Sequence, residues 1–388
     1  MHCDVSSLEL KAPLRLSYLK MQGAMRTVGL GCLLCLGAAA CATTQSAPKA
    51  GPDRVQMEPV LVRAHADPLT GLSGYDAKQL LDVGNDEFDK EAYDRALTVY
   101  DKLLAEFPDS THVPLALYNS GLCYERLEET EQAVLRFQRV IDMHPDAGTH
   151  RDALFRKAFL MGKLKRWTEV ADTFWAARQL KNLNTMDELE ARVGQGVGMF
   201  MQNDYPTAEF EFRSALNFYR EKKKTEFLPA EYWVGQSRFY LGEIYAREME
   251  GVALSAPSKA HDKWVDMMGK ELEKKCELLL RAQNNFIRAI RVGHHGWATA
   301  AGFRIGALYE RLYDDLIEVP VPPELTEDQK QAYREELQKR VGVLVTKAIN
   351  VYEMSLEMAE RVGQKNEWVD KTSESLERMK RLYLAQLD

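Results

Sequence analysis

A frame of 34 residues recurs along the chain, and this repeat limits the possible folds more than any other feature. Segments 77–110 and 114–147 both contain an apolar stretch with a glycine, then a turn, an alanine, an aromatic residue and a proline. In the first segment, Gly84 is expected to let two helices approach closely. Pro108 is expected to end the second helix, because proline cannot continue a helix. Each segment therefore predicts a pair of antiparallel helices.

The same frame continues in segments 151–184 and 189–222, and the pairs Leu241-Gly242 and Ile305-Gly306 begin two further copies whose second helix arrives late. This spacing resembles the tetratricopeptide repeat. The resemblance implies an all-α superhelical solenoid of about six helix pairs, in which helix A and helix B of each repeat stack on the next pair.

Apolar positions recur with helical spacing over about 36 residues from Pro257 and again from Thr326. We therefore predict that the B helices of the last two repeats are elongated and lie side by side as a projecting arm. The alternative is that each is two helices, broken near Gly269 and Gly342. Residues 366–388 are expected to form a C-terminal capping helix that closes the last hydrophobic face.

Residues 25–41 read MRTVGLGCLLCLGAAAC, in which Arg26 precedes an apolar run of 13 residues, 28–40. A run this short has the length of a signal-peptide core rather than of a membrane-spanning helix. Ala38-Ala39-Ala40-Cys41 resembles the bacterial lipobox, which implies cleavage before Cys41 and lipid attachment to it. A plain secretory cleavage site and a membrane helix are the alternatives.

The chain is therefore divided into a lipoprotein signal peptide (1–40), a lipid-anchored flexible tether rich in Ala, Pro, Thr and Gly (41–74) and the solenoid (75–388). Residues 1–20 fit none of these signals, so translation is expected to start at Met21 or Met25. Residue 42 is Ala rather than Asp, and the lipoprotein resemblance then implies sorting to the outer membrane.

No catalytic motif, metal-ligand spacing or cofactor motif stands out, so we expect no enzyme activity, no metal and no cofactor. The glycines of Gly194-Gln195-Gly196-Val197-Gly198 are expected to pack within a helix rather than to hold phosphate. His294-His295 is expected to end the B helix of repeat five. Cys123 and Cys276 fall in different repeats, too far apart for a disulfide. A net charge of −7 argues against nucleic acid.

Proteins with this repeat, as the resemblance implies, hold partner segments in a concave groove lined by helix A. Some positions of this face can instead belong to the core between helices. The residues expected to line the groove are Leu81, Tyr118, Leu122, Phe155, Phe159, Val193, Val197, Phe239 and Phe303.

Two parts of the chain carry resemblances to narrower groups. FPDS-x-x-x-x-LALYNSGLCYE, at 107–125, resembles periplasmic proteins of envelope assembly such as the tetratricopeptide lipoprotein of the β-barrel assembly machine. The segments at 313–337 and 350–379 look more like the tetratricopeptide lipoproteins of the myxobacterial gliding-motility (Glt) complex. These resemblances imply a scaffold on the periplasmic face of the outer membrane that binds other envelope proteins, with no small-molecule substrate. Gliding motility is the expected machine, and the alternative is an assembly factor for β-barrels or a pilus secretin.

Overall fold

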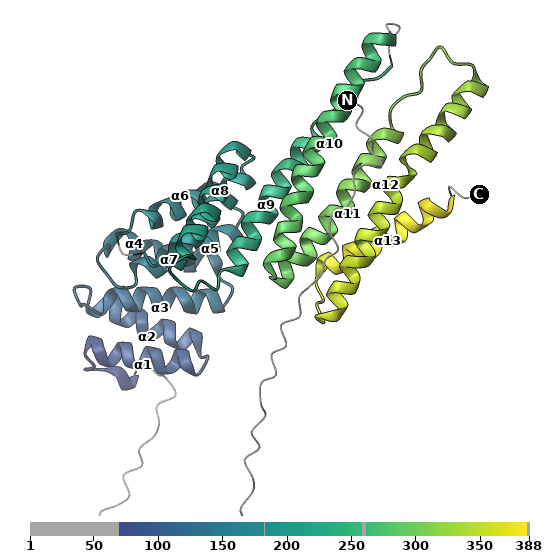
Figure 1. Ribbon diagram of the computed structural model, residues 1–388. Coiled ribbons are helices and arrows are strands. Elements are labelled where there is room, and N and C mark those ends of the chain that lie inside the picture. The colour runs from purple at the N-terminus through teal and green to yellow at the C-terminus, as the bar shows by residue number, and fades with distance from the viewer. Residues whose placement is uncertain (1–69, 182, 258–260, 386–388) are drawn as a thin grey trace, which may run out of the picture. The chain divides into compact units, whose positions relative to one another are not determined.

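The computed structural model describes residues 70–388, except for 182, 258–260 and 386–388 (Figure 1). The signal peptide, Cys41 and the tether up to residue 69 lie outside the described residues. The described part contains no strand; after the short 3-10 helix η2 (Thr70–Leu72) it forms thirteen α-helices. Their bounds are α1 Ala77–Asp89, α2 Tyr93–Glu106, α3 Val113–Arg126, α4 Thr130–Met143, α5 His150–Lys163, α6 Trp167–Arg178, α7 Thr185–Met201, α8 Tyr205–Lys222, α9 Glu231–Glu250, α10 His261–Val292, α11 His295–Ile317, α12 Glu327–Arg361 and α13 Glu367–Ala385.

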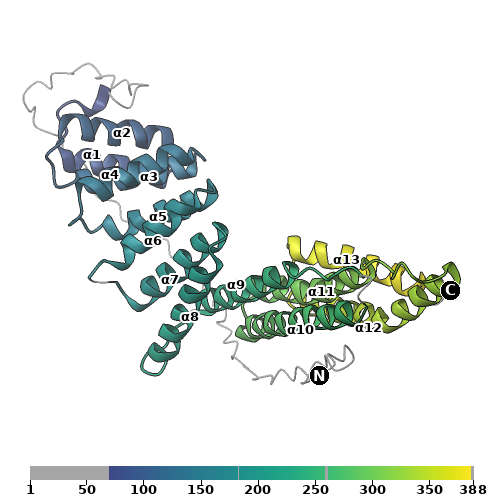
Figure 2. The ribbon, with the colours of Figure 1, turned by 90° about the horizontal axis from the view of Figure 1, so that it is seen from above.

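Each helix packs against the next one along the chain, so α1 to α12 form six pairs of a helix A and a helix B (Figures 1 and 2). The turns inside the first four pairs are alike, because each contains one residue with a left-handed backbone: Glu91, Glu128, Lys165 and Asn203, with φ of 58° to 64°. The predicted all-α solenoid of six helix pairs is confirmed.

The last two pairs are longer than the first three. The B helices α10 and α12 contain 32 and 35 residues and run without a break through Gly269 and Gly342, so the elongation is confirmed and the broken-helix alternative is wrong. Pro257 precedes α10 and is not helical. The A helices α9 and α11, with 20 and 23 residues, are also lengthened, which the repeat pattern did not predict.

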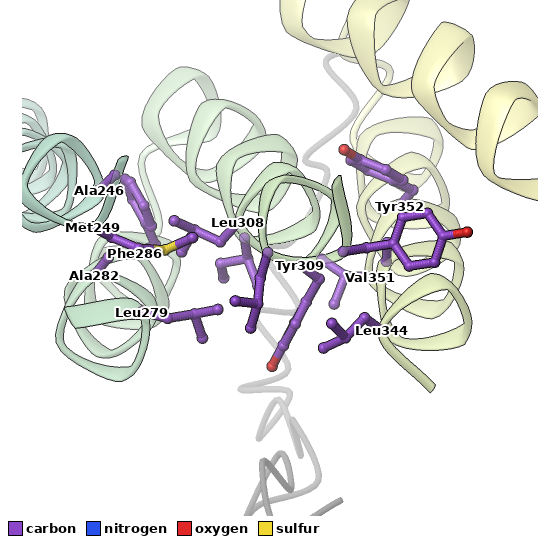
Figure 3. Packing of buried hydrophobic residues seen from close by; sticks show 14 of the residues in the cluster. Ala246, Met249, Leu279, Ala282, Phe286, Leu308, Tyr309, Leu344, Val351 and Tyr352 are labelled. Atoms are coloured by element: carbon purple, nitrogen blue, oxygen red, sulfur yellow. The ribbon is translucent and has the colours of Figure 1, made fainter. Parts of the chain in front are cut away.

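The prediction that the two long B helices lie side by side is wrong. Helix α11 packs against both α10 and α12 and lies between them (Figures 1 and 2). Figure 3 shows the resulting core: Phe286 of α10 lies on one side of α11, and Tyr352 of α12 on the other. Both rings and Tyr309 of α11 are fully buried. A helix A must contact the helix B on each side of it, and this requirement separates the two long helices.

The last helix, α13, covers the end of the array, as the sequence predicts for a capping helix. Leu376 and Met379 are buried in the core that α9 to α12 share, while its other face is polar and exposed. The predicted tether boundary differs slightly from the structure, because Leu72 is already buried in the first core.

Cys123 and Cys276 are both buried and are not joined by a disulfide, as expected from their separation. Burial raises the pKa of the Cys123 thiol to about 12, so this thiol stays protonated at neutral pH. Among the described residues, no helix combines the length and the apolar character needed to span a membrane.

Candidate functional site: the face of the A helices

Four of the residues predicted to bind a partner lie on the A helices of repeats two and three. Tyr118 and Leu122 are half-buried on α3, and the Tyr118 ring lies 5.4 Å from that of Phe137. On α5, Phe155 is half-buried against Phe174, with ring centroids 5.9 Å apart. All three side chains are partly exposed, and the two aromatic rings also pack on the helix B of their own repeat.

Phe159 is different, because 54% of its surface is exposed. The Lys163 ammonium lies 4.8 Å from its ring centroid, at the distance of a cation–π contact. Phe159 also lies one helical turn from Arg156, whose Nη1 donates to Glu125 Oε1 of α3 at 3.3 Å. The pair links α5 to α3 beside the apolar residues. This arrangement gives a surface with an aromatic centre and charges of both signs at its edge.

Three of the predicted groove residues lie in the core instead, so they are not part of the proposed partner surface. Val193 is fully buried, and Leu81 and Phe239 each keep only 5% exposure. The A helix α9 packs against α7 as well as against its own neighbours, which covers the side of α7 that carries Val193. Val197 is half-buried against the same core.

Phe303, the last predicted groove residue, is covered by the capping helix. Its ring lies 5.7 Å from that of Trp368 of α13 and 6.1 Å from that of Tyr352. Asn366, just before α13, donates its side-chain amide to the Thr299 hydroxyl at 3.1 Å, which fixes the start of α13 against α11. The groove predicted at repeats five and six is therefore filled by the chain's own aromatic rings.

A cluster of aromatic residues that the repeat pattern did not reveal lies at the start of α9 and α11. Tyr232 is 42% exposed, and its ring lies 5.7 Å from Trp297 and 4.6 Å from Trp233. The Trp297 ring also contacts Phe239, at 5.2 Å. The buried Trp297 Nε1 has no hydrogen-bond partner within the described part of the chain. Tyr232 and Trp297 occupy the extra first turns of the lengthened A helices, outside the 34-residue frame, so the repeat pattern carried no signal for them.

Glu190 of α7 lies close enough to Tyr232 for its carboxyl group to affect the ionisation of the Tyr232 hydroxyl. Burial, together with the charge of the neighbouring Asp187 carboxylate, raises the pKa of Glu190 to about 7. Burial also raises the pKa of Tyr232, and the negative charge of Glu190 adds to that rise. Asp187 in turn pairs with Arg151 at 3.2 Å, which joins α7 to α5.

Two sequence interpretations concern sites of other kinds. Gly194, Gly196 and Gly198 lie inside α7 and face Phe174, Phe212 and Ala171, as the packing interpretation predicts. His294 does not end the preceding helix; it is the N-cap of α11, and its Nδ1 accepts a hydrogen bond from the Trp297 backbone N–H at 3.3 Å. The chain leaves α10 through Gly293, whose φ of 92° reverses its direction, and this gives His294 its place at the start of the next helix. Among the described residues, no group of three His, Cys, Asp or Glu side chains is placed to hold a metal ion.

Comparison with known families agrees with this geometry. A tetratricopeptide-repeat family model matches residues 115–147, which are α3, α4 and the turn after them. The chain contains a tetratricopeptide repeat. The same helix pair recurs before and after this match, so the described part of the chain is a tetratricopeptide-type solenoid, a fold that is typical of non-catalytic scaffold proteins.

No curated protein matches the sequence significantly. Among solved structures, a tetratricopeptide repeat protein from Parabacteroides merdae is 13% identical, with 80% of this chain and 99% of that chain covered at a TM-score of 0.37. MamA from Desulfovibrio magneticus RS-1 is 16% identical over 53% of this chain and 97% of that chain, with a TM-score of 0.35. PilW, a type IV pilus biogenesis factor, is 14% identical over 68% of this chain and 92% of that chain, with a TM-score of 0.35.

Proposed function

We propose that the chain is a non-catalytic scaffold that binds a protein partner on the apolar face of α3 and α5. The observation that carries this proposal is the exposure of Phe159, a large aromatic side chain, beside the half-buried Tyr118, Leu122 and Phe155. Aromatic residues in the centre of an interface contribute strongly to binding, because a partner removes their remaining surface from water. An amphipathic or aromatic segment of a partner fits this face.

The proposed location is the periplasmic face of the outer membrane, with a lipid on Cys41 as the anchor. Its support is the sequence at 25–41, a short apolar run that ends in three alanines and a cysteine, together with Ala42 in the position after it. The 33 residues after Cys41, up to the predicted end of the tether at 74, would let the solenoid reach partners away from the membrane surface.

The proposed machine is the gliding-motility complex of the envelope. Its support is the resemblance of segments 313–337 and 350–379 to tetratricopeptide lipoproteins of that complex. The alternative is an assembly factor for outer-membrane β-barrels or a pilus secretin, which the resemblance of 107–125 to envelope-assembly proteins favours.

The test is crosslinked affinity purification of the tagged full chain from its native cells, followed by mass spectrometry. We expect outer-membrane barrels and periplasmic gliding proteins among the captured partners. Recovery of barrel-assembly or secretin components in their place would overturn the gliding assignment and leave the scaffold role intact.

A pair of variants tests the binding face itself. Phe159→Glu places a charge in the centre of the proposed interface and should abolish partner capture. Trp175→Glu is the matched control, because Trp175 lies on helix B of the same repeat and is similarly exposed, at 56% against 54% for Phe159. Equal capture by the two variants would show that the face of α3 and α5 does not bind the partner.

A further inference from the structure

Three helices meet around Tyr245 of α9, and their arginines are balanced by acidic side chains there. Arg213 of α8 donates from Nη2 to the Tyr245 hydroxyl oxygen at 2.7 Å, and the guanidinium of Arg281 of α10 lies 5.8 Å from the Tyr245 ring centroid. Arg213 pairs with Glu209 at 2.7 Å, and Arg281 pairs with Glu277 at 2.6 Å. Helices α8 and α10 flank α9 around Tyr245, and each of the two arginines there forms an ion pair with a carboxylate.

Two helical turns away, the same three helices each present an arginine again. Residue 238 lies seven positions before Tyr245 on α9, and seven residues are about two turns of an α-helix. Helices α8 and α10 run antiparallel to α9, so the corresponding positions lie seven residues further on, at Arg220 and Arg288. We call Arg220, Arg238 and Arg288 the arginine row.

The arginine row has no acidic partner in the described part of the chain. Arg220 donates only to the side-chain oxygen of Asn217, at 3.1 Å, and neither Arg238 nor Arg288 forms an ion pair there. Two turns on from Glu209 and Glu277, the equivalent positions are Leu216 and Asn284. Carboxylates equivalent to those that neutralise the arginines near Tyr245 are therefore missing beside the arginine row.

The arginines of this row lie close enough to repel one another. Arg238 is half-buried. Burial, together with the positive charges of the neighbouring Arg288, Arg220 and Arg213, lowers the pKa of its guanidinium to about 10. The group still carries its charge at neutral pH. A half-buried charge without a counter-ion is unfavourable for folding, and a bound anion would offset that cost.

We propose that the arginine row binds an extended acidic segment of a partner protein, whose carboxylates meet the three guanidinium groups in turn. Guanidinium groups form two parallel hydrogen bonds with a carboxylate, which suits them to this role. Neighbouring helix axes are about 8–10 Å apart, so the row extends over about two such steps. Alternate side chains of an extended chain are about 7 Å apart, and five to seven residues or so span the row. One phosphate ion is too small to reach all three groups.

This surface uses residues of α8, α9 and α10, whereas the face in the proposed function uses α3 and α5. The inference rests on the proposed function only in taking a protein as the partner. With a net charge of −7, the chain as a whole repels acidic segments, so any attraction is local to the row.

The test measures binding of a synthetic probe to the full-length protein in detergent by fluorescence anisotropy. The probe is a fluorescein-labelled peptide in which Asp alternates with Ser, and its control replaces each Asp with Asn. The Asp peptide should bind with an affinity that falls as salt rises, and the Asn peptide should not bind. The double variant Arg220→Gln with Arg288→Gln should weaken binding at least about tenfold, because each lost guanidinium contributes a charge-assisted hydrogen bond.

The matched control is Arg213→Gln with Arg281→Gln, which removes the same number of charges from the same two helices. It should change the affinity less than about threefold, because those arginines already have carboxylate partners. Equal weakening by both double variants, or no binding of the Asp peptide, would overturn the proposal. Displacement of the peptide by inorganic phosphate at concentrations near the peptide's own Kd would instead assign the row to a free anion.

Phe159→Glu should leave the affinity for the Asp peptide unchanged. The synthetic probe replaces the native partner, so failure of the partner-capture experiment in cells does not affect this result.

Discussion

At the scale of single residues, one position of the repeat shows how the fold is reused for different chemistry. Helix A of each repeat has a small residue at one fixed position, which is Ala158 in repeat three and a glycine in the other repeats. Four residues before it, the first three repeats have a buried leucine: Leu80, Leu117 and Leu154. Repeat four has Arg192, which pairs with Glu188 at 2.6 Å and lies 4.9 Å from the Phe218 ring. Repeat five has Arg238, which lacks such partners. The backbone frame is kept while the side chain changes from core to charged surface.

The addition of even one methyl group to the glycine at the close-contact position of helix A is expected to destabilise the fold. A Cβ on Gly306 would lie 2.2 Å from the Tyr352 ring, whose hydroxyl donates to Glu310 at 2.8 Å. The ring is buried and held, so Gly306→Ala should lower the free energy of unfolding by about 1–3 kcal/mol. Urea denaturation followed by circular dichroism measures this loss.

Gly269→Ala is the control for that variant, because a Cβ there meets no atom within 4 Å on α10. Alanine is the better helix former, so this change should raise the free energy of unfolding by about 0.5–1 kcal/mol. Equal effects of the two substitutions would mean that Tyr352 does not pack against the Gly306 backbone.

At the scale of elements, lengthening both helices of a pair changes what the core must contain. Lys275 of α10 is 1% exposed, and its Nζ donates to Asp315 of α11 at 2.6 Å and to the Met249 carbonyl at the end of α9 at 2.9 Å. One buried ammonium thereby joins three consecutive helices. Sequence periodicity predicted the length of α10. It did not predict that a buried lysine of α10 would form hydrogen bonds where α9 ends.

Lys275→Met should therefore destabilise the protein, even though methionine fills most of the same volume. It removes the ammonium's hydrogen bond to the Met249 carbonyl and leaves Asp315 paired with Arg311 alone, at 2.8 Å. The expected loss in the free energy of unfolding is about 3 kcal/mol. Chemical denaturation measures it.

The comparison for this variant is Lys270→Met on the same helix. Lys270 pairs with Asp266 at 2.7 Å with both side chains largely exposed, so its removal should change stability by less than about 1 kcal/mol. A similar cost at both positions would argue that the buried pair adds nothing to the packing of α9, α10 and α11.

At the scale of the whole molecule, the proposed roles combine a lipid anchor at Cys41, a tether and a solenoid that offers two separate surfaces. The face of α3 and α5 is apolar and aromatic, and the arginine row on α8, α9 and α10 is basic. Two surfaces of different chemistry on one chain suit a scaffold, because separate partners can be bound at the same time.

The anchor is tested by Cys41→Ala. Without the thiol no lipid can be attached, so the protein should move from the membrane fraction to the soluble periplasmic fraction. Cell fractionation with immunoblotting measures this. Cys123→Ala serves as the control, because Cys123 is a buried cysteine of the solenoid and is not part of the lipobox sequence. Retention of the Cys41→Ala protein in the membrane fraction would refute lipid anchoring.

The sequence by itself determined the all-α class, the six helix pairs, the two long B helices and the capping helix. These depend on local rules: the spacing of apolar residues along a helix, the small residues at close helix contacts and the prolines after helix ends. The exposed or half-buried residues of the proposed binding face on α3 and α5 also follow from the repeat frame.

The tertiary structure alone decided the rest. Periodicity identifies the side of a helix that faces inward, but not which neighbour covers the other side. Leu81, Val193 and Phe239 are buried, and Phe303 is covered by Trp368, because of such neighbours. The arginine row depends on three helices meeting in one register, and Arg220, Arg238 and Arg288 are far apart in the sequence. Their meeting is a property of helix packing, which no local pattern encodes.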